Sequence, residues 1–278
     1  MLLFQAVVLG IVQGLTEFLP VSSSGHLILV REVFGWELLA DDHLNKMFDV
    51  ALHAGTFCAL VVYFRSDLAR LARAFGASLR GGLAGDVDRR LSWLIVIGTV
   101  PAAVAGLSGQ DVIETKLGNP MLVSGLLVVF GLVLWAAEWR GAKRRGLRET
   151  GWWDGVALGV AQATALVPGV SRSGITITAG LARGMTREAA ARFSFLLSIP
   201  IVGGTAAYSF LGLAREPEAL PGAALGMFVV GTVAAVFSGY LCIHYFLRYL
   251  QRRSLLPFVV YRVGLGLFLL LWLGIRGG

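Results

Sequence analysis

The chain has 278 residues, of which 56% are hydrophobic and only 15% are charged. Its mean hydropathy of +0.74 excludes the class of soluble globular proteins. The net charge of +7 comes from clusters of basic residues, so it does not indicate a surface that binds nucleic acid. The two cysteines predict neither a disulfide framework nor a metal cluster.

In chain order, the first apolar segment, residues 7–28, is interrupted at mid-length by Pro20 and a run of serines that ends at Gly25. A second segment, residues 156–177, is interrupted in the same place and aligns with the first without a gap. Apolar segments broken at corresponding places in two halves of a chain indicate a binding site inside a membrane. The alternative is a pair of ordinary spans kinked at proline, which does not explain small and polar residues in lipid.

Six further segments are apolar and long enough to cross a bilayer, which takes about 20 residues. They cover approximately residues 47–64, 92–108, 120–139, 193–212, 223–245 and 257–275. The sequence therefore predicts an all-α polytopic membrane protein with six transmembrane helices and two re-entrant helix-loop-helix segments. We expect a single integral membrane domain over residues 1–278, with repeat 1 at about 1–140 and repeat 2 at about 150–278.

Basic residues gather in four connectors, at residues 65–90, 140–148, 183–192 and 248–253. If both broken segments return to the side from which they enter, the six spans place all four connectors on one face. The positive-inside rule makes that face cytoplasmic. The first broken segment then enters from outside and the second from the cytoplasm. The two copies would form an inverted-topology repeat whose tips meet near mid-membrane.

Glu17 is the strongest candidate for chemistry, because an acid flanked by Leu15, Phe18 and Leu19 is costly in a bilayer and is functional by default. Gln13 lies one helical turn earlier on the same face. The two side chains could share a divalent cation or position a water. The alternative is a Glu17 carboxylate that pairs with an arginine for structure alone.

Arg172 takes, in the second copy, the position that Ser23 has in the first, and it stands between Ser171 and Ser173. A guanidinium matches phosphate oxygens bidentately. The surrounding serines and glycines supply hydroxyl and backbone N–H donors, and a helix that begins there adds its positive dipole end. The pattern predicts an anion cradle. A salt bridge from Arg172 to Glu17 is the simpler alternative, and it is compatible with function.

Ser23 and His26 are three residues apart, so they could face each other across one turn. A serine near a histidine or carboxylate can be an activated nucleophile, although serine runs in membrane helices more often pack or cap. His26 is either a general acid–base group or a hydrogen-bonding prop. Asp49 and His53 either line the cavity or cap the next span. Arg262, inside the last apolar segment, is expected to pair internally or to reach the interface.

Two motifs carry a family resemblance. Residues 13–26, QGLTEFLPVSSSGH, resemble the (E/Q)-x-x-x-E motif and the following Ser/Gly/His segment of the bacterial undecaprenyl-diphosphate phosphatases, the bacitracin-resistance family. Residues 168–176, PGVSRSGIT, resemble the PGxSRSGxT motif of the same family. Length, number of spans and both repeats agree over nearly the whole chain. Gln13 stands at the first acidic position, which the motif allows, so Glu17 is left as the key acid.

The resemblance implies a hydrolase that removes the terminal phosphate of undecaprenyl diphosphate. Such an enzyme recycles the lipid carrier of peptidoglycan synthesis and confers resistance to bacitracin. Glu17, Ser23, His26 and Arg172 are then the expected catalytic residues, with Ser23 or a water as the nucleophile. The expected phosphate-binding positions are Ser22, Ser24, Gly25, Ser171, Ser173, Gly174 and Thr176.

A Mg²⁺ or Ca²⁺ ion near Glu17 and Gln13 would neutralise phosphate charge. The expected partners are undecaprenyl diphosphate and membrane lipids, and a homodimer is left open. We expect the bacterial inner membrane, with a site that faces the periplasm, since Glu17 belongs to the copy that enters from outside. The rival function is a lipid-phosphate transporter or flippase, because inverted repeats with broken helices are also the architecture of secondary transporters.

Overall fold

A computed structural model describes the backbone of residues 2–36, 42–83, 85–215 and 222–276. It also describes the side chains in these ranges, except those of residues 42–43, 110–116, 209–215, 222–224 and 276. This part of the chain forms eleven α-helices and one short 3-10 helix, without a β-strand. The helices are α1 (Leu2–Phe18), α2 (Ser23–Phe34), α3 (Asp42–Tyr63), α4 (Arg65–Gly81), α5 (Val87–Lys116), α6 (Pro120–Arg140), η1 (Leu147–Glu149), α7 (Trp152–Thr164), α8 (Arg172–Ala182), α9 (Arg187–Arg215), α10 (Gly222–Leu250) and α11 (Leu256–Arg276).

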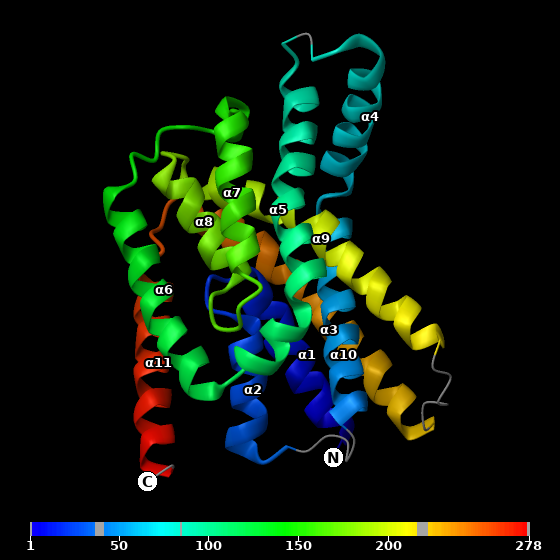
Figure 1. Ribbon diagram of the computed structural model, residues 1–278, viewed down its shortest axis with the longest axis vertical. Coiled ribbons are helices and arrows are strands. Elements are labelled where there is room, and N and C mark those ends of the chain that lie inside the picture. Colours follow the sequence, from blue (N-terminus) through cyan, green and yellow to red (C-terminus); the bar gives the residue numbers. More distant parts are fainter. Residues whose placement is uncertain (1, 37–41, 84, 216–221, 277–278) are drawn as a thin grey trace.

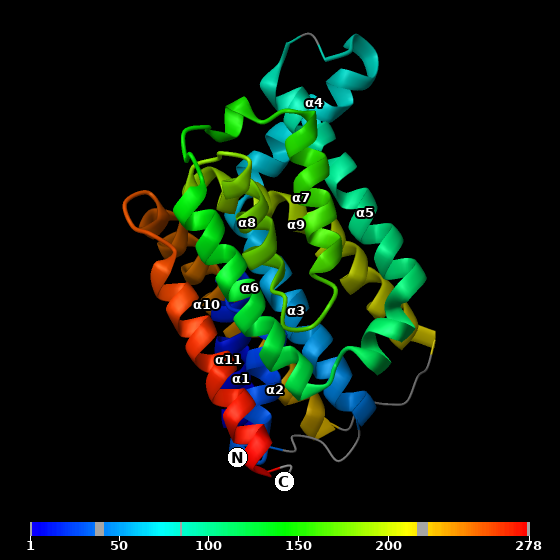
Figure 2. The same ribbon diagram turned by 60° about the vertical axis from the view of Figure 1, so that its left-hand side comes forward.

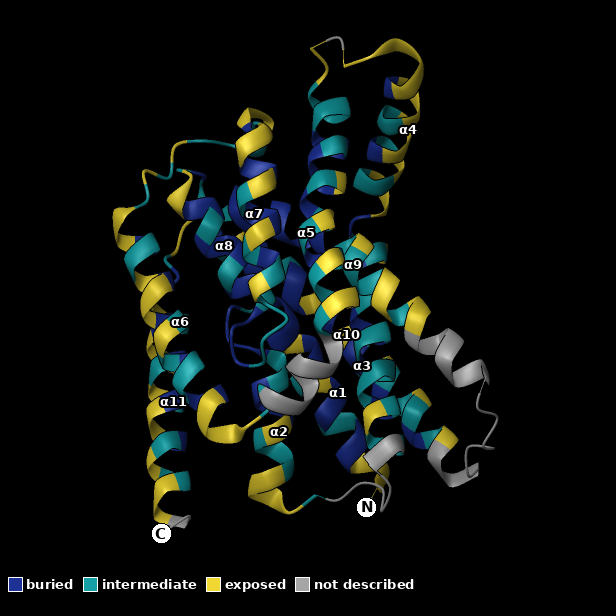
Figure 3. Cartoon of the chain, viewed as in Figure 1, coloured by how far each residue is buried: buried dark blue, intermediate teal, exposed yellow. Residues whose placement is uncertain are grey.

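Six of these helices are long and apolar enough to cross a membrane. They supply the segments Leu44–Tyr63, Val87–Gly109, Pro120–Arg140, Arg187–Tyr208, Leu225–Leu250 and Leu256–Ile275. Each overlaps one of the six predicted spans, so the prediction of an all-α, multi-pass membrane protein is confirmed. Large apolar side chains are exposed on α6 and α11, and Figure 3 shows exposed residues at intervals along the length of both helices. Lipid tails solvate such faces, whereas water does not.

The sequence missed α4, because residues 65–90 read only as a basic connector. Alanine, leucine and arginine fill this helix, and all three have high helix propensity. Leu71 is buried in the main hydrophobic core, and the Trp93 indole of α5 donates a hydrogen bond to the Ser78 hydroxyl (2.9 Å). α4 is therefore an amphipathic helix that packs against α5 at the basic end of the molecule (Figure 1).

The two broken segments form helical hairpins that approach each other from opposite ends of the molecule. In Figures 1 and 2, α1 and α2 reach upward from the end where α11 finishes. α7 and α8 reach downward from the end that carries α4. Their turns lie in the middle, where Figure 3 shows mainly buried residues. The basic connectors after α3, α6 and α8 lie at the α4 end, as the charge pattern predicts (Figure 2).

The hairpins pack against the two halves of the chain in a crosswise manner. α1, from the first half, packs along α10, and α7, from the second half, packs along α5. Both crossings depend on glycine: a Cβ atom on Gly10 would lie 2.3 Å from the Gly231 oxygen, and one on Gly159 would lie 2.6 Å from the Gly98 oxygen. Gly10 and Gly159 are corresponding positions of the two aligned segments. Small residues allow backbones to approach closely in membrane helix pairs.

Candidate active site

Glu17, at the end of α1, is the centre of a hydrogen-bonded cluster. Its Oε2 atom accepts a hydrogen bond from the Ser23 hydroxyl at 2.6 Å and another from Gln13 Nε2 at 3.1 Å. Its Oε1 atom accepts one from Arg172 Nη2 at 2.8 Å. Glu17 and Arg172 are both largely shielded from solvent, with 9% and 14% of their side chains exposed. The structure thus places the two candidates from different hairpins in one site.

The backbone is strained at the same position in both tips. Ser22 and Ser171 are corresponding residues, and they have φ angles of 75° and 71°, which are unfavourable for residues other than glycine. Each precedes the first residue of a helix, α2 or α8. That first residue is Ser23 in one copy and Arg172 in the other, and both contact Glu17. Strain of about 1–3 kcal/mol at each position must be offset by the packing around the tips.

The positive ends of two helices are directed to this cluster, because α2 begins at Ser23 and α8 begins at Arg172. The first backbone N–H groups of a helix lack partners within the helix and favour anions. At the α8 end, the Ser171 hydroxyl accepts a hydrogen bond from the Gly174 N–H (3.1 Å). The Ser173 hydroxyl donates to the Leu19 carbonyl (2.9 Å), which ties the second tip to the first.

Two buried polar atoms in the cluster have no hydrogen-bond partner among the described residues. They are Arg172 Nη1, which is a donor, and Gln13 Oε1, which is an acceptor. Buried polar groups are nearly always satisfied in folded proteins. One free donor suits a phosphate oxygen, and one free acceptor beside a carboxylate suits a cation or a water.

His26 occupies a different place from the one that its spacing suggested. One ring nitrogen, Nδ1, lies 2.7 Å from the Ser22 carbonyl oxygen, and Nε2 lies 2.7 Å from the Tyr261 hydroxyl. Of the two interpretations of His26, these contacts favour the hydrogen-bonding prop. The His26 ring instead contacts the backbone carbonyl four residues earlier in the chain, and the Ser23 hydroxyl donates to Glu17. His26 fixes the first tip and stacks on the Tyr261 ring, with ring centres 5.6 Å apart.

Arg262 of α11 forms hydrogen bonds to both hairpin tips. It is completely buried, and its guanidinium donates to the carbonyls of Pro20 (3.4 Å), Gly169 (2.6 Å) and Val170 (2.5 Å). It also donates to the Leu127 carbonyl of α6 (3.1 Å). The sequence left open whether this arginine pairs internally or reaches the interface, and it gave no role in the site. The one sequence signal for Arg262 was a charged residue within an apolar segment. Its partners are backbone carbonyls, and no sequence pattern identifies these.

Asp49 and His53, for which two interpretations were open, have separate roles. His53 Nε2 lies 3.8 Å from Glu17 Oε2, so this histidine belongs to the cluster. Asp49 pairs with Arg31 of α2, with Nη1 to Oδ2 at 2.9 Å, and lies outside the cluster. The helical spacing placed both residues on one face but could not decide how far each lies from Glu17.

The remaining predicted phosphate-binding positions divide into two groups. Ser22 and Ser24 share a hydroxyl contact of 3.3 Å in the first tip, and Ser171 and Ser173 share one of 3.3 Å in the second. Thr176, one turn further along α8, forms a different set of contacts. Its hydroxyl donates to the Arg172 carbonyl (2.6 Å) and contacts the Ser194 hydroxyl of α9 (2.5 Å), so it fastens α8 to the core.

Gly25 and Gly174 are both buried in the tips, and a Cβ atom on Gly174 would lie 2.8 Å from Arg262 Nη1. A side chain at Gly174 would force the Arg262 guanidinium to move away from the carbonyls that it binds. Among the described residues, no group of three His, Cys, Asp or Glu side chains could hold a metal ion. The predicted divalent cation would have to rely on amide, hydroxyl and substrate oxygens beside one carboxylate.

Comparison with known proteins identifies the family of the chain. Residues 6–268 match the profile of the bacitracin resistance protein BacA. The chain belongs to the BacA family. This match covers the tips of both hairpins, the first five spans and more than half of the sixth, so the family resemblance predicted from the two motifs is confirmed.

Named relatives agree with this assignment over almost their full length. The chain is 48% identical over 269 residues to the undecaprenyl-diphosphatase of Thioalkalivibrio sulfidiphilus (strain HL-EbGR7). The aligned region covers 96% of this chain and 98% of the relative. It is 46% identical to undecaprenyl-diphosphatase 2 of Stutzerimonas stutzeri (strain A1501), over 96% of this chain and 97% of that protein. The undecaprenyl-diphosphatase of Teredinibacter turnerae (strain ATCC 39867 / T7901) is 44% identical over 96% and 98%.

Proposed function

We propose that this BacA-family protein is an undecaprenyl-diphosphatase, a membrane-embedded hydrolase that converts undecaprenyl diphosphate to undecaprenyl phosphate and inorganic phosphate. The observation that carries the proposal is the Ser23–Glu17–Arg172 arrangement, in which a hydroxyl lies 2.6 Å from a carboxylate that is fixed by a guanidinium. The names of the relatives give the substrate, and the six spans match a substrate with a lipid tail. This activity recycles the carrier lipid of the cell wall and accounts for bacitracin resistance.

Ser23 is the proposed nucleophile. Its oxygen attacks the terminal phosphorus while Glu17, at hydrogen-bond distance, accepts the hydroxyl proton. The bond between the terminal phosphorus and the bridging oxygen breaks, undecaprenyl phosphate leaves with that oxygen, and a phosphoserine forms. A water then attacks the phosphoserine, the Ser23 oxygen regains a proton, and inorganic phosphate is released. Direct attack by water with Glu17 as base is the alternative.

Arg172 is proposed to bind the oxygens of the transferred phosphoryl group. Catalysis of phosphoryl transfer consists mostly of positioning and electrostatic stabilisation. Nη1 of Arg172 is free of hydrogen bonds within the described part of the chain, so it can donate to phosphate while Nη2 remains on Glu17. The N-terminal N–H groups of α2 and α8 add donors at the same place. The hydroxyls of Ser22 and Ser24 in the first tip, and of Ser171 and Ser173 in the second, are proposed as further contacts to phosphate.

A Mg²⁺ or Ca²⁺ ion is proposed as a cofactor. The oxygens of Glu17, Gln13 and Ser23 fit a hard cation, and Gln13 Oε1 is buried without a partner in the described structure. Mg²⁺ commonly uses one or two carboxylates together with substrate phosphates and waters. When bound, such an ion would neutralise negative charge on the diphosphate.

The two hairpins are proposed to be re-entrant segments of an inverted repeat, with repeat 1 at about 1–140 and repeat 2 at about 150–278 of one membrane domain. Three observations support this arrangement: the crosswise packing of α1 on α10 and α7 on α5, the corresponding Gly10 and Gly159 contacts, and the strained serines in both tips. The basic connectors favour a cytoplasmic α4 end. The site would then open to the periplasm of a bacterial inner membrane.

Phosphate release from undecaprenyl diphosphate by the purified protein in detergent tests this function, with Mg²⁺, with Ca²⁺ and with a chelator. We expect turnover in at least one metal condition. A lipid-phosphate transporter, which the inverted packing would also suit, has no turnover without two compartments. Absence of phosphate release from folded protein in every condition would reject the hydrolase and favour the transporter.

A further inference from the structure

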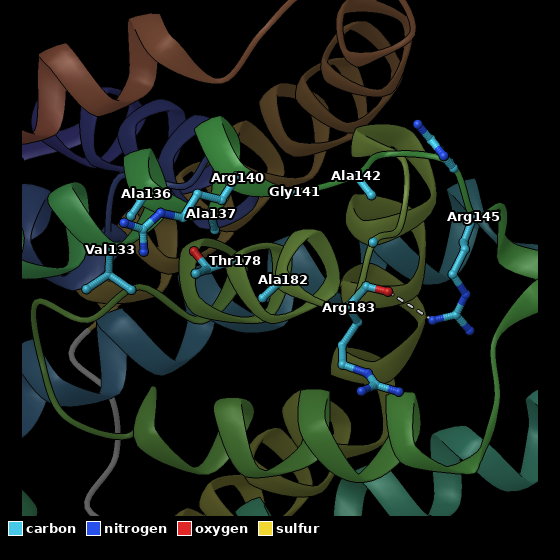
Figure 4. Close-up of a pocket in the computed structure, with 12 residues that line it drawn as sticks. Val133, Ala136, Ala137, Arg140, Gly141, Ala142, Arg145, Thr178, Ala182 and Arg183 are labelled. Carbon is cyan, nitrogen blue, oxygen red and sulfur yellow. Dashed lines mark hydrogen bonds between the residues drawn. The ribbon is translucent and has the colours of Figure 1, made fainter.

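A pocket lies at the basic end of the molecule, and none of its lining residues belongs to the Glu17 cluster. It has a volume of about 690 Å³ and is formed by the end of α6, the connector that follows it and the end of α8. Four of its lining residues are small or apolar, namely Val133, Ala136, Ala137 and Ala182, and we refer to them as the floor, although Val133 and Ala182 are exposed. Four arginines, Arg140, Arg144, Arg145 and Arg183, also line the pocket, and we refer to them as the rim. In the view of Figure 4, Thr178 and Ala182 lie between the side chains of Arg140 and Arg183. This size is typical of a site for a small molecule or lipid headgroup.

The arginines of the rim differ in how far their charge is neutralised. Arg145 and Arg183 share a single buried carboxylate, Asp154, with contacts of 2.6 Å and 2.8 Å. Burial raises the pKa of Asp154, but the hydrogen bonds from Arg145, the Gly151 N–H and Arg183 outweigh it and hold the pKa below its usual value. The exposed Glu149 carboxylate also attracts Arg145, so the positive charge of the pocket comes mainly from its other two arginines, Arg140 and Arg144.

Arg140 and Arg144 add charge that no carboxylate balances in the described part of the chain. Both side chains are exposed, and neither forms an ion pair with an acid there; Arg140 lies over the Trp139 ring at 5.7 Å. The nearby Glu138 carboxylate is buried and paired with Arg187 (2.5 Å). The pocket therefore presents a net positive rim above an apolar floor.

The connector that forms one wall is held in place rather than loose. The N–H groups of Arg144 and Arg145 donate to the Gly184 carbonyl, each at 3.0 Å, and the Thr186 N–H donates to the Arg145 carbonyl at 2.8 Å. These bonds fix the connector against the turn between α8 and α9. A wall that is already ordered reduces the entropic cost of binding a ligand.

Exposed tryptophans near the pocket indicate its position relative to the membrane surface. Trp135 and Trp139 stack on the exposed side of α6 with ring centres 6.2 Å apart, and Trp139 directly precedes Arg140. Trp152 and Trp153 are exposed at the start of α7, at the same end of the molecule. Tryptophan favours the membrane–water interface. The pocket is thus level with lipid headgroups.

We propose that this pocket binds the phosphate headgroup of an anionic membrane lipid from the leaflet at the basic face. Arg140 and Arg144 would bind the phosphate oxygens, for which guanidinium groups are suited, and the glycerol or first methylene groups would lie on the alanine floor. This binding is separate from the hydrolysis of undecaprenyl diphosphate, because the pocket shares no lining residue with the Glu17 cluster. The apolar floor favours a lipid over free phosphate.

The test is a titration of the intact, detergent-solubilised protein with phosphatidylglycerol and with phosphatidylcholine, with bound lipid counted by native mass spectrometry. We expect phosphatidylglycerol to bind the wild type at least about tenfold more tightly than the variant Arg140→Gln/Arg144→Gln does, because each basic residue near an anionic lipid contributes favourably. Arg73→Gln/Arg80→Gln removes the same charge from the exposed face of α4 and should change affinity less than about twofold.

Two further measurements distinguish a lipid site from a diffuse charged surface and from a site for free phosphate. Ala182→Phe fills the floor from an exposed position without changing charge, and it should abolish tight binding while thermal stability is retained. Inorganic phosphate should compete poorly. Equal loss of affinity in the α4 control and the pocket variant would overturn the proposal in favour of the charged surface. Full competition by inorganic phosphate, or unchanged binding by Ala182→Phe, would also overturn it.

Discussion

Arg172 Nη2 lies 2.8 Å from Glu17 Oε1, although 155 positions separate the two residues in the chain. Each residue belongs to the tip of a different helical hairpin, so this contact closes the site that both hairpins build. The same carboxylate accepts a hydrogen bond from the Ser23 hydroxyl through its other oxygen. Both hairpins therefore orient Glu17, and it can accept a proton from a serine that it already contacts.

Replacement of Ser23 distinguishes the two nucleophiles. If Ser23 forms a phosphoserine, Ser23→Ala should lower the rate of phosphate release by at least about a thousandfold, as expected for loss of a nucleophile. Rapid acid quenching of the wild type during turnover should trap phosphate on Ser23, detectable by peptide mass spectrometry. Ser24→Ala, next in the same tip, is the matched control and should retain a rate within about tenfold of the wild type. Full activity of Ser23→Ala would assign the attack to water.

Arg262 is expected to act as a positioning residue, because it binds carbonyls of both tips but does not contact Glu17. Arg262→Lys keeps the charge but cannot donate to four carbonyls from a fixed planar fork. We expect kcat to fall by at least about tenfold with a smaller change in KM, since displaced tips weaken the transition state more than substrate binding. Arg248→Lys, at the exposed end of α10, is the control. Equal loss in both variants, or a change in KM alone, would contradict this role.

Much of this architecture could be predicted from the sequence, because its signals are local or repeated. The six spans follow from runs of apolar residues, and the two tips follow from Pro, Ser and Gly in corresponding places. The partners of Arg262 and the separate roles of Asp49 and His53 depend on distances between helices, which no local pattern contains. The spacing allowed His26 to face Ser23, but spacing along a helix gives a shared face and not the rotamer, and the imidazole contacts the Tyr261 hydroxyl instead.

Gly10 and Gly159 should be equally intolerant of a side chain. A Cβ atom at either position would meet backbone atoms of the facing helix at under 3 Å, namely those of Gly231 and Gly98. We expect Gly10→Ala and Gly159→Ala each to cost about 1–3 kcal/mol of stability through overpacking. Gly264→Ala, which meets nothing within 4 Å on α11, is the control. Thermal unfolding in detergent measures all three, and a large difference between Gly10→Ala and Gly159→Ala would argue against equivalent crossings.

Asp154 should make the protein sensitive to acid. Because the folded-state pKa of Asp154 lies below the ordinary value of 3.8, its ionised form stabilises the fold above that pH, and this contribution is lost as the pH falls through the lower pKa. Asp154→Asn should lower the melting temperature near neutral pH, since it leaves Arg145 and Arg183 without their buried partner. The difference from the wild type should shrink below pH 3.8.

Glu188→Gln serves as the control for this pH series, because its carboxylate lies at the surface, where it accepts a hydrogen bond from Gln251 (3.2 Å). It should leave the melting temperature nearly unchanged at every pH. A difference between the wild type and Asp154→Asn that stays constant far below pH 3.8 would mean that the charge of Asp154 does not contribute.

Both hairpin tips are proposed to form one phosphatase site. The most direct test measures phosphate release from undecaprenyl diphosphate by the variants Glu17→Gln and Arg172→Gln and by the double variant. Each single variant should lose at least about a hundredfold in rate. The double variant should be little slower than either, because residues that act as a unit are not additive. Arg187→Gln, which breaks a salt bridge at the basic end of the molecule, should remain active. A folded single variant with near wild-type rate, or losses that multiply in the double variant, would contradict a shared site.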